Sequence, residues 1–198
     1  MSDRLALAPL SLLWLAWLVY WFAAARDVKA TARREPAASR LGHSLLMIVA
    51  GVLLSLRHLP GGLSAHFVQA SAATYALGLI MVAGGLGISI WARRVLGRNW
   101  SGIVTVKQDH ELIRTGPYRY VRHPIYTGLL LAILGTALIF GEWRGLIAFV
   151  IFTAAIMLKV RTEERFMDES FPEQYARYRA EVPALLPFLP QRAEQSTS

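Results

Sequence analysis

Five apolar runs are the feature that most constrains the fold of this chain. A helix needs about 20 residues to cross the hydrocarbon core of a bilayer, with about 17–25 as the usual range. The first three runs have this length, and the last two are shorter and lie four residues apart, which predicts a tight helical hairpin. The runs are Leu5–Ala25, Leu41–Leu59, Ala72–Ala92, Ile125–Phe140 and Gly145–Val160. We therefore predict an all-α integral membrane protein with about five transmembrane helices.

The charge pattern supports this count and gives an orientation. The chain is 55% hydrophobic with a net charge of +8, and 18 of its 21 Lys and Arg residues fall on one side of a five-span topology. Basic loops concentrate on the cytoplasmic side of membrane proteins. We expect an N-terminus outside, a cytoplasmic C-terminus and residence in a bacterial inner membrane. The basic loops would face anionic lipid headgroups rather than nucleic acid, and no feature indicates an oligomeric state.

The absence of cysteine excludes disulfides, thiol nucleophiles and cysteine metal sites. The sequence also lacks a phosphate-binding loop, the HExxH pattern of zinc enzymes and the GxSxG turn of serine hydrolases. We expect no metal. Channels and transporters usually carry polar groups inside several spans or paired broken helices, and these runs have little of either.

We predict a single membrane domain over residues 1–190 with four parts. These are three N-terminal spans in 1–92, a cytoplasmic segment in 93–124, the helical hairpin in 125–160 and a cytoplasmic tail helix in 161–190, followed by a disordered tail in 191–198. The cytoplasmic segment weakly predicts a strand hairpin in which 103–106 pairs with 111–113.

Two groups in the N-terminal spans carry specific expectations. We expect the aromatic residues of the first span to face lipid or the membrane interface; these are Trp14, Trp17, Tyr20 and Trp21. We expect the glycines of the third span to let another helix or a ligand approach its backbone; these are Gly78, Gly84, Gly85 and Gly87.

The segment GPYRYVRHPIYTG, residues 116–128, is the densest group of polar and aromatic side chains in the chain. Pro124 suits the first turn of a helix, so Arg122 and His123 precede the fourth span and Tyr126 lies in its first turn. Charged groups at the mouth of an apolar segment are costly unless they bind something. The positive end of the helix could hold a carboxylate, whereas a structural role would have Arg122 reach lipid phosphate and His123 cap the helix.

A second group, Glu163 and Glu164, lies where the fifth span leaves the membrane, after Lys159 and Arg161. The two acids could pair with these bases or with Arg122, or bind a ligand. Adjacent residues on a helix project about 100° apart, so we expect one of the two at most to point straight into a given pocket. A solvated helix face is the alternative.

With these two motifs and the later FPEQYARY, the chain resembles the isoprenylcysteine carboxyl methyltransferase family over residues 91–187, and phospholipid N-methyltransferases look similar in the same places. The resemblance implies a membrane methyltransferase that uses S-adenosylmethionine and acts on a lipophilic or lipidated substrate. The implied cofactor residues are Gly116, Pro117, Tyr118, His123, Tyr126, Glu163 and Glu164. Arg122 would orient a carboxylate acceptor, and Glu163 or Glu164 would be the base for an amine acceptor.

Three alternatives stay open beside a carboxylate acceptor. The first is methylation of a phospholipid or other amine. The second is an NADPH-dependent membrane reductase, which resembles this chain at Arg122-His123-Pro124 but whose HPNYxGE pattern has Asn and Glu where this chain has Ile125 and Leu129. The third is a membrane scaffold without enzymatic activity.

Overall fold

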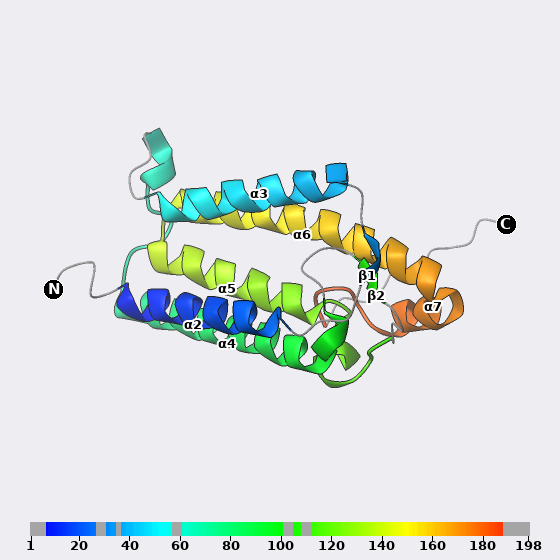
Figure 1. The fold of residues 1–198 in the computed structure, drawn as a ribbon. Helices are drawn as coiled ribbons and strands as arrows, with labels where there is room; N and C mark the ends of the chain where they lie inside the picture. The colour runs from blue at the N-terminus through cyan, green and yellow to red at the C-terminus, as the bar shows by residue number, and fades with distance from the viewer. Residues whose placement is uncertain are drawn as a thin grey trace.

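The structure is a computed structural model that describes residues 7–26, 31–34, 37–56, 61–100, 105–107 and 112–187. Each of the five apolar runs forms a helix (Figure 1): α2 (Ala8–Ala24), α3 (Ala37–Ser55), α4 (Ala72–Leu96), α5 (Pro124–Phe140) and α6 (Trp143–Ser170). One shorter helix follows, α7 (Pro172–Glu181). The connections contain the 3-10 turns η1 (Gly61–Ser64), η2 (Gly97–Asn99) and η3 (Gly116–Arg119), and the strands β1 (Thr31–Arg34) and β2 (Thr105–Lys107).

The prediction of an all-α membrane fold is confirmed. In the described residues, three helical segments are long and apolar enough to cross a membrane: Ala37–Ser55, Ala72–Asn99 and Trp143–Ser170. The apolar helices α2 and α5 have 17 residues each, which is the lower end of the spanning range. The predicted hairpin is present, since α5 and α6 are joined through Gly141 in a left-handed conformation (φ 66°).

The helices form a bundle in which α5 lies between two pairs, α3 with α6 and α2 with α4 (Figure 1). The helices α2 and α3 therefore lie on opposite sides of α5. This arrangement leaves room for a cavity that reaches between them from the end of the bundle near α7.

Matched glycines bring α4 and α5 into close contact. Gly78 and Gly85 of α4 face Gly135 and Gly128 of α5, and a Cβ added at Gly78 would lie 2.8 Å from the Gly135 carbonyl oxygen. A Cβ at Gly85 would lie 2.7 Å from the Ala132 backbone nitrogen. Small residues at helix crossings replace the hydrophobic driving force that is absent in lipid. The expectation of close helix approach is thus confirmed for Gly78 and Gly85.

The expectation of close approach by another helix is wrong for Gly84 and Gly87. No heavy atom among the described residues lies within 4 Å of a Cβ added at either position.

The expectation that the aromatic residues of the first span face lipid is wrong for three of the four. The Trp14 indole donates to Thr136 Oγ1 of α5 (3.1 Å), and Trp17 donates to Ser89 Oγ of α4 (2.7 Å). Trp17 also stacks on Trp21, with ring centroids 4.7 Å apart. An indole N–H in an apolar surround needs an acceptor, and inward-facing hydroxyls on α4 and α5 provide one.

The predicted strand at 103–106 has a different partner. Strand β2 pairs antiparallel with β1, so that Thr31 faces Lys107 and Arg34 faces Thr105, and the described residues 112 and 113 form no strand. The turn expected at 107–110 lies largely outside the described residues. The pairing joins the segment after α2 to the segment after α4, a non-local contact that a local turn pattern cannot indicate.

At the opposite end of the bundle, Arg144 closes the end of α3. Its guanidinium is buried, pairs with Glu142 and donates to the carbonyls of Leu53 and Leu54, each at 3.1 Å. The last carbonyls of a helix have no partner within it, so Arg144 satisfies them and fixes α6 against α3.

A pair of alanine substitutions tests the α4–α5 contact. Gly85→Ala should lower the melting temperature by about 5 °C, because the added methyl meets backbone atoms of α5 and overpacking costs about 1–3 kcal/mol. Gly84→Ala should leave it unchanged or raise it, since the site is open and alanine favours a helix by about 1 kcal/mol. Thermal unfolding of the detergent-solubilised proteins measures both. Equal melting temperatures would contradict this packing.

Candidate active site

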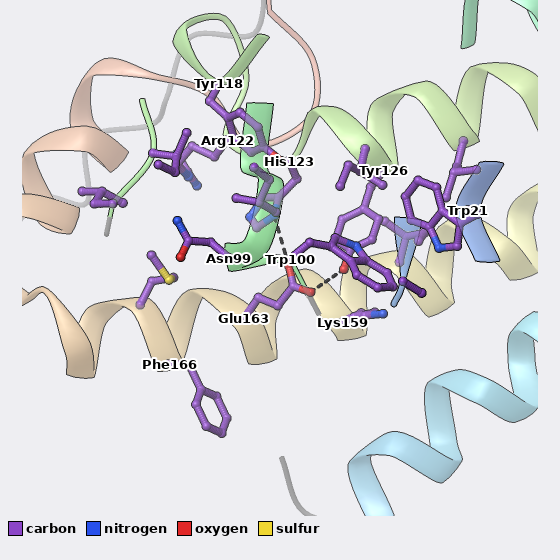
Figure 2. A pocket seen from close by; sticks show the side chains of 18 of the residues that line it. Trp21, Asn99, Trp100, Tyr118, Arg122, His123, Tyr126, Lys159, Glu163 and Phe166 are labelled. Carbon is purple, nitrogen blue, oxygen red and sulfur yellow. Dashed lines mark hydrogen bonds and ion pairs between the residues drawn. The ribbon is translucent and has the colours of Figure 1, made fainter. Parts of the chain in front are cut away.

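One cavity of about 470 Å³ lies between the helices and beneath the segment that joins η3 to α5 (Figure 2). Its wall is largely apolar and aromatic, with a few charged groups. The lining residues come from every helix: Trp17, Trp21, Phe22, Ala25, Met47, Leu96, Asn99, Trp100, Leu112, Ile113, Tyr118, Arg122, His123, Ile125, Tyr126, Leu129, Phe152, Ile156, Lys159, Glu163, Phe166, Met167, Tyr175 and Tyr178. A concave apolar site with few polar groups is typical of small-molecule binding.

One face of α6 runs the whole length of this cavity. Phe152, Ile156, Lys159, Glu163 and Met167 all line it and recur at three- and four-residue steps. At 1.5 Å per residue the face extends about 22 Å. The Phe152 end is apolar and lies among α2 and α3, the Met167 end lies among η2, η3 and α7, and charged groups occupy the middle. The cavity is therefore long enough for two different ligands, and its apolar and charged parts suit ligands of different polarity.

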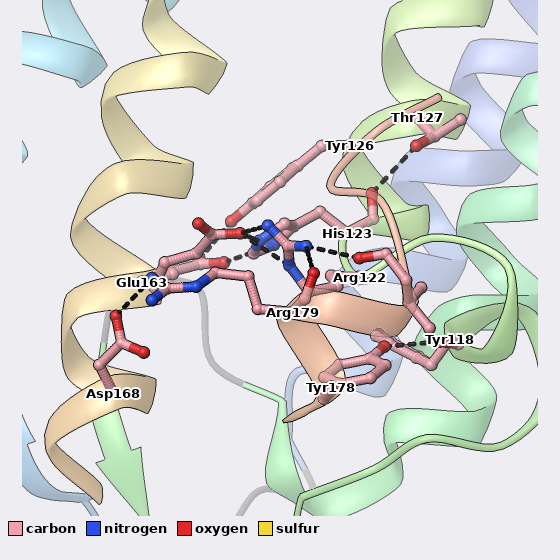
Figure 3. Close-up of polar contacts among 11 residues, drawn as sticks. Tyr118, Arg122, His123, Tyr126, Thr127, Glu163, Asp168, Tyr178 and Arg179 are labelled. Atoms are coloured by element: carbon pink, nitrogen blue, oxygen red, sulfur yellow. Dashed lines mark hydrogen bonds and ion pairs between the residues drawn. The ribbon is translucent and has the colours of Figure 1, made fainter. Parts of the chain in front are cut away.

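Arg122 joins three segments at the polar side of the cavity (Figure 3). Its Nε and Nη2 donate to Glu164 Oε1 of α6, at 3.0 and 2.6 Å, and Nη1 donates to the Arg179 carbonyl of α7 at 3.2 Å and to the Val182 carbonyl. Four of the five guanidinium N–H groups are used in this way. The side chain is buried, so these bonds form where water does not compete.

The backbone of this turn is held by the segment after α7. The N–H groups of Arg122 and His123 donate to the carbonyls of Pro183 (2.9 Å) and Ala184 (3.0 Å). Thr127 Oγ1 donates to the Leu185 carbonyl at 2.7 Å. The N–H groups of Arg122 and His123, just before α5, are therefore already bonded by the chain itself, which weakens the expectation that the start of the helix binds a ligand carboxylate.

His123 bridges the two glutamates. Its Nε2 lies 3.1 Å from Glu164 Oε1 and its Nδ1 lies 3.4 Å from Glu163 Oε2. The Tyr126 hydroxyl donates to Glu163 Oε1, and the Tyr126 ring stacks on His123 with centroids 5.8 Å apart. Lys159 Nζ lies 5.6 Å from the centre of the Tyr126 ring. The result is a connected cluster of opposite charges, in which His123 is buried and the two glutamates are half-buried.

The surroundings shift the pKa values of the ionisable groups outside the helices that span the membrane. Burial opposes the charged form of His123, but its contacts with Glu163 and Glu164 outweigh burial and raise its pKa above the ordinary 6.5. Burial, with the nearby Glu163 charge, raises the pKa of Tyr118, and burial raises that of Tyr178 to about 12. The tyrosines at this end are therefore neutral hydrogen-bond donors at neutral pH.

Five of the eight site residues expected from the sequence line the cavity: Tyr118, Arg122, His123, Tyr126 and Glu163. Glu164 is absent from the wall, as expected for one of two adjacent glutamates, and pairs behind it with Arg122. Gly116 (φ 59°) starts η3 and packs on Val95, and Pro117 is buried beside it. Gly116 and Pro117 thus shape the turn without reaching the cavity.

Several cavity residues were not expected from the sequence. The aromatic wall includes Trp17, Trp21 and Trp100, and the polar wall includes Asn99, Lys159 and Tyr175. Lys159 could have been predicted as a cavity residue, because it lies four residues before Glu163 and so on the same face of α6. Among the described residues no group of three or more His, Asp or Glu side chains could hold a metal ion.

Comparison with known proteins gives consistent matches. The phospholipid methyltransferase family matches residues 73–174, just over half of the chain. Protein-S-isoprenylcysteine O-methyltransferase of Schizosaccharomyces pombe is 34% identical over 97 residues, 48% of this chain and 41% of that protein. The cobalt-zinc-cadmium resistance protein CzcN of Cupriavidus metallidurans is 33% identical over 127 residues, 63% of this chain and 56% of that protein.

The chain spans about half the length of the curated relatives it matches. Among solved structures, the eukaryotic intramembrane Ras methyltransferase ICMT (isoprenylcysteine carboxyl methyltransferase) is similar with a TM-score of 0.53 and 21% identity. That match covers 76% of this chain and 51% of the other. This match shows that the two proteins have a similar fold.

Replacement of Arg122 should destabilise the protein. Arg122→Gln leaves Glu164 and two carbonyls without their cationic donor, and removal of one partner of a buried ion pair costs about 3–5 kcal/mol. Arg119→Gln, on the exposed side of the same turn, should change stability by less than about 0.5 kcal/mol. Thermal unfolding compares them, and similar melting temperatures would refute the role given to Arg122.

His123 should titrate above pH 6.5. Because its folded pKa is raised, the stabilisation that it gives is fully present below about pH 6.5 and is lost as pH rises through the folded pKa. Histidine-selective NMR in detergent measures the midpoint, which should fall in Glu164→Gln. A midpoint below 6.5 in the unaltered protein would show that burial outweighs the two glutamates.

Proposed function

Because this chain belongs to the phospholipid methyltransferase family, we propose that it is an integral membrane enzyme that transfers a methyl group from S-adenosylmethionine to a lipophilic acceptor. The observation that carries the proposal is a cavity with an apolar part among α2, α3 and α6 and charged groups beneath the η3–α5 turn. A lipid-borne acceptor fits the apolar part, and a polar methyl donor fits near the charged groups.

S-adenosylmethionine supplies a methyl carbon on a sulfonium, whose C–S bond breaks with its electron pair passing to sulfur as the acceptor atom forms the new bond. Transfer to a carboxylate cancels charge, and transfer to a neutral amine moves the positive charge from sulfur to nitrogen. In neither case does new charge form, so a dry site that aligns the two reactants is favoured. The buried aromatic wall around Tyr126 supplies such a site and offers ring faces to a cation.

A carboxylate acceptor like that of an isoprenylcysteine is our first proposal. It is ionised at neutral pH and needs no base. Arg122 was expected to orient it, but that guanidinium already binds Glu164 and two carbonyls. We assign the orienting role to Lys159 and protonated His123, which line the middle of the cavity. Arg122 acts by positioning Glu164, His123 and α7.

An amine acceptor is the second candidate, favoured by the name of the matching family and by Glu163 in the cavity wall. An ammonium group must lose a proton before it can attack carbon. Glu163 Oε1 accepts from Tyr126 and its Oε2 lies 3.4 Å from His123 Nδ1. A proton taken by Glu163 would thus enter a cluster that can redistribute it.

The charge bias of the sequence supports an orientation in which the end of the cavity near α7 faces the cytoplasm of a bacterium. The methyl donor is polar and cytosolic, so this end would admit it directly. The acceptor would enter from the bilayer, where three helices have the length and composition of membrane spans.

Isothermal titration of the detergent-purified protein tests the donor first. We expect S-adenosylhomocysteine to bind with micromolar affinity and NADPH not to bind. Glu163→Gln should weaken binding at least about 10-fold, because hydrogen bonds to charged groups contribute about 1.5–3 kcal/mol. Glu173→Gln, exposed on α7, is the matched control and should bind normally.

Methyl transfer from labelled S-adenosylmethionine to N-acetyl-S-farnesylcysteine or to phosphatidylethanolamine then separates the two acceptor classes. Ester formation alone supports the carboxylate proposal, and N-methylation alone supports the second candidate. Binding of NADPH without S-adenosylhomocysteine would refute both and favour a reductase. A folded protein that binds neither ligand would favour a scaffold.

A further inference from the structure

Two buried polar groups in the cavity wall lack hydrogen bonds among the residues that the structure describes: nothing donates to the first, and the second lies near the Arg122 guanidinium but has no acceptor for its proton. They are the Asn99 Oδ1 atom, at the end of η2, and the Tyr175 hydroxyl of α7. Both residues line the cavity, and Tyr175 is only 2% exposed. An unsatisfied buried polar group costs about 1–3 kcal/mol, so such groups in a cavity wall call for an explanation.

The neighbouring Tyr178 provides the contrast. Its ring packs against Tyr175 with centroids 6.0 Å apart, yet its hydroxyl donates to the Tyr118 carbonyl at 2.5 Å. The two tyrosines share a helix and a hydrophobic cluster, and only one has a protein acceptor. Burial raises the pKa of Tyr175, so its hydroxyl remains a protonated donor.

The surroundings of these two groups indicate what they would bind. Their end of the cavity is aromatic and aliphatic, because Leu112, Met167 and Tyr178 pack with Tyr175 there. Trp100 lies farther along and packs on Trp21 with ring centroids 5.3 Å apart. In the view of Figure 2, Asn99 lies on the same side as Arg122, away from Trp21 and Tyr126. The charged groups Lys159 and Glu163 lie one to two helical turns before Met167 along α6.

A charged amino-acid group would be poorly solvated at this end and is better matched by Lys159, Glu163 and His123. A flat heterocycle is different, because it can stack on aromatic rings and still use hydrogen bonds at its edge. An adenine ring has a donor and an acceptor side by side, and a carboxamide pairs with both.

We propose that the Asn99 amide and the Tyr175 hydroxyl are the adenosine-binding groups of this cavity, with Asn99 on the adenine edge. The inference rests on the proposed function, because it assigns the end of the cavity that the methyl donor occupies. The sulfonium would then point along α6 toward Tyr126 and Glu163, and the acceptor would lie beyond it.

The test compares three variants by titration with S-adenosylhomocysteine and with 5′-methylthioadenosine, which keeps the nucleoside and lacks the amino-acid end. Tyr175→Phe and Asn99→Leu should each weaken binding of both ligands by about 10-fold, the cost of one lost hydrogen bond. The melting temperature of ligand-free Tyr175→Phe should change little, since the hydroxyl proton that is removed has no acceptor. Tyr178→Phe is the matched control, and its ligand-free melting temperature should be lower.

The outcomes are separable. Unaltered affinity in a folded Tyr175→Phe protein overturns the proposal even if Asn99→Leu fails to fold. Weakened binding of S-adenosylhomocysteine with normal binding of 5′-methylthioadenosine also overturns it, because the contacts would then be to the amino-acid end. If the unaltered protein binds neither ligand, the proposed function fails and this inference fails with it.

Discussion

The hydrogen bonds of Arg122 are the interaction on which the cavity depends. One guanidinium connects the turn before α5, the end of α6 through Glu164, and the C-terminal end of α7 through two carbonyls. These segments are far apart in the sequence, and each supplies a part of the cavity wall. A charge at the end of a membrane span is stable only when it is paired or solvated. Here pairing places His123 and Glu163 at the cavity surface.

The cavity also combines residues that lie inside the family match with residues that lie outside it. The polar cluster and α4 to α6 fall within residues 73–174, where the family matches. The apolar end adds Trp17, Trp21 and Phe22 from α2 and Met47 from α3, which precede that match. The end near α7 adds Tyr175 and Tyr178 from just after it. Most polar groups of the cavity therefore come from the matched core, and the N-terminal helices supply part of its apolar wall.

Much of the helical fold and of the polar part of the site could be predicted from local physical chemistry. Apolar runs of spanning length can satisfy their backbone only as helices in a bilayer, and the runs and helices agree. The residues Arg122, His123, Tyr126 and Glu163 share a cavity because Pro124 starts α5 beside the part of α6 that carries Glu163. The position of Trp17 and Trp21 was not predictable in this way, because α2 is apolar all round and no polar face shows which side is inward. The pairing of β1 with β2 depends on contacts about 70 residues apart.

The charge balance of the cluster has a further consequence for the chemistry. Two carboxylates and two cations, Arg122 and protonated His123, cancel within one connected network. Methyl transfer from a sulfonium to a carboxylate also cancels charge. A nearly neutral, dry wall stabilises charged reactants little, so it does not favour them over the neutral products. Lys159 is a further cation on the same wall, and it would attract an anionic acceptor before reaction and release a neutral ester after it. With an amine acceptor the same lysine would repel the substrate. The sign of the charge at residue 159 is therefore the feature of this cavity that most favours a carboxylate over an amine.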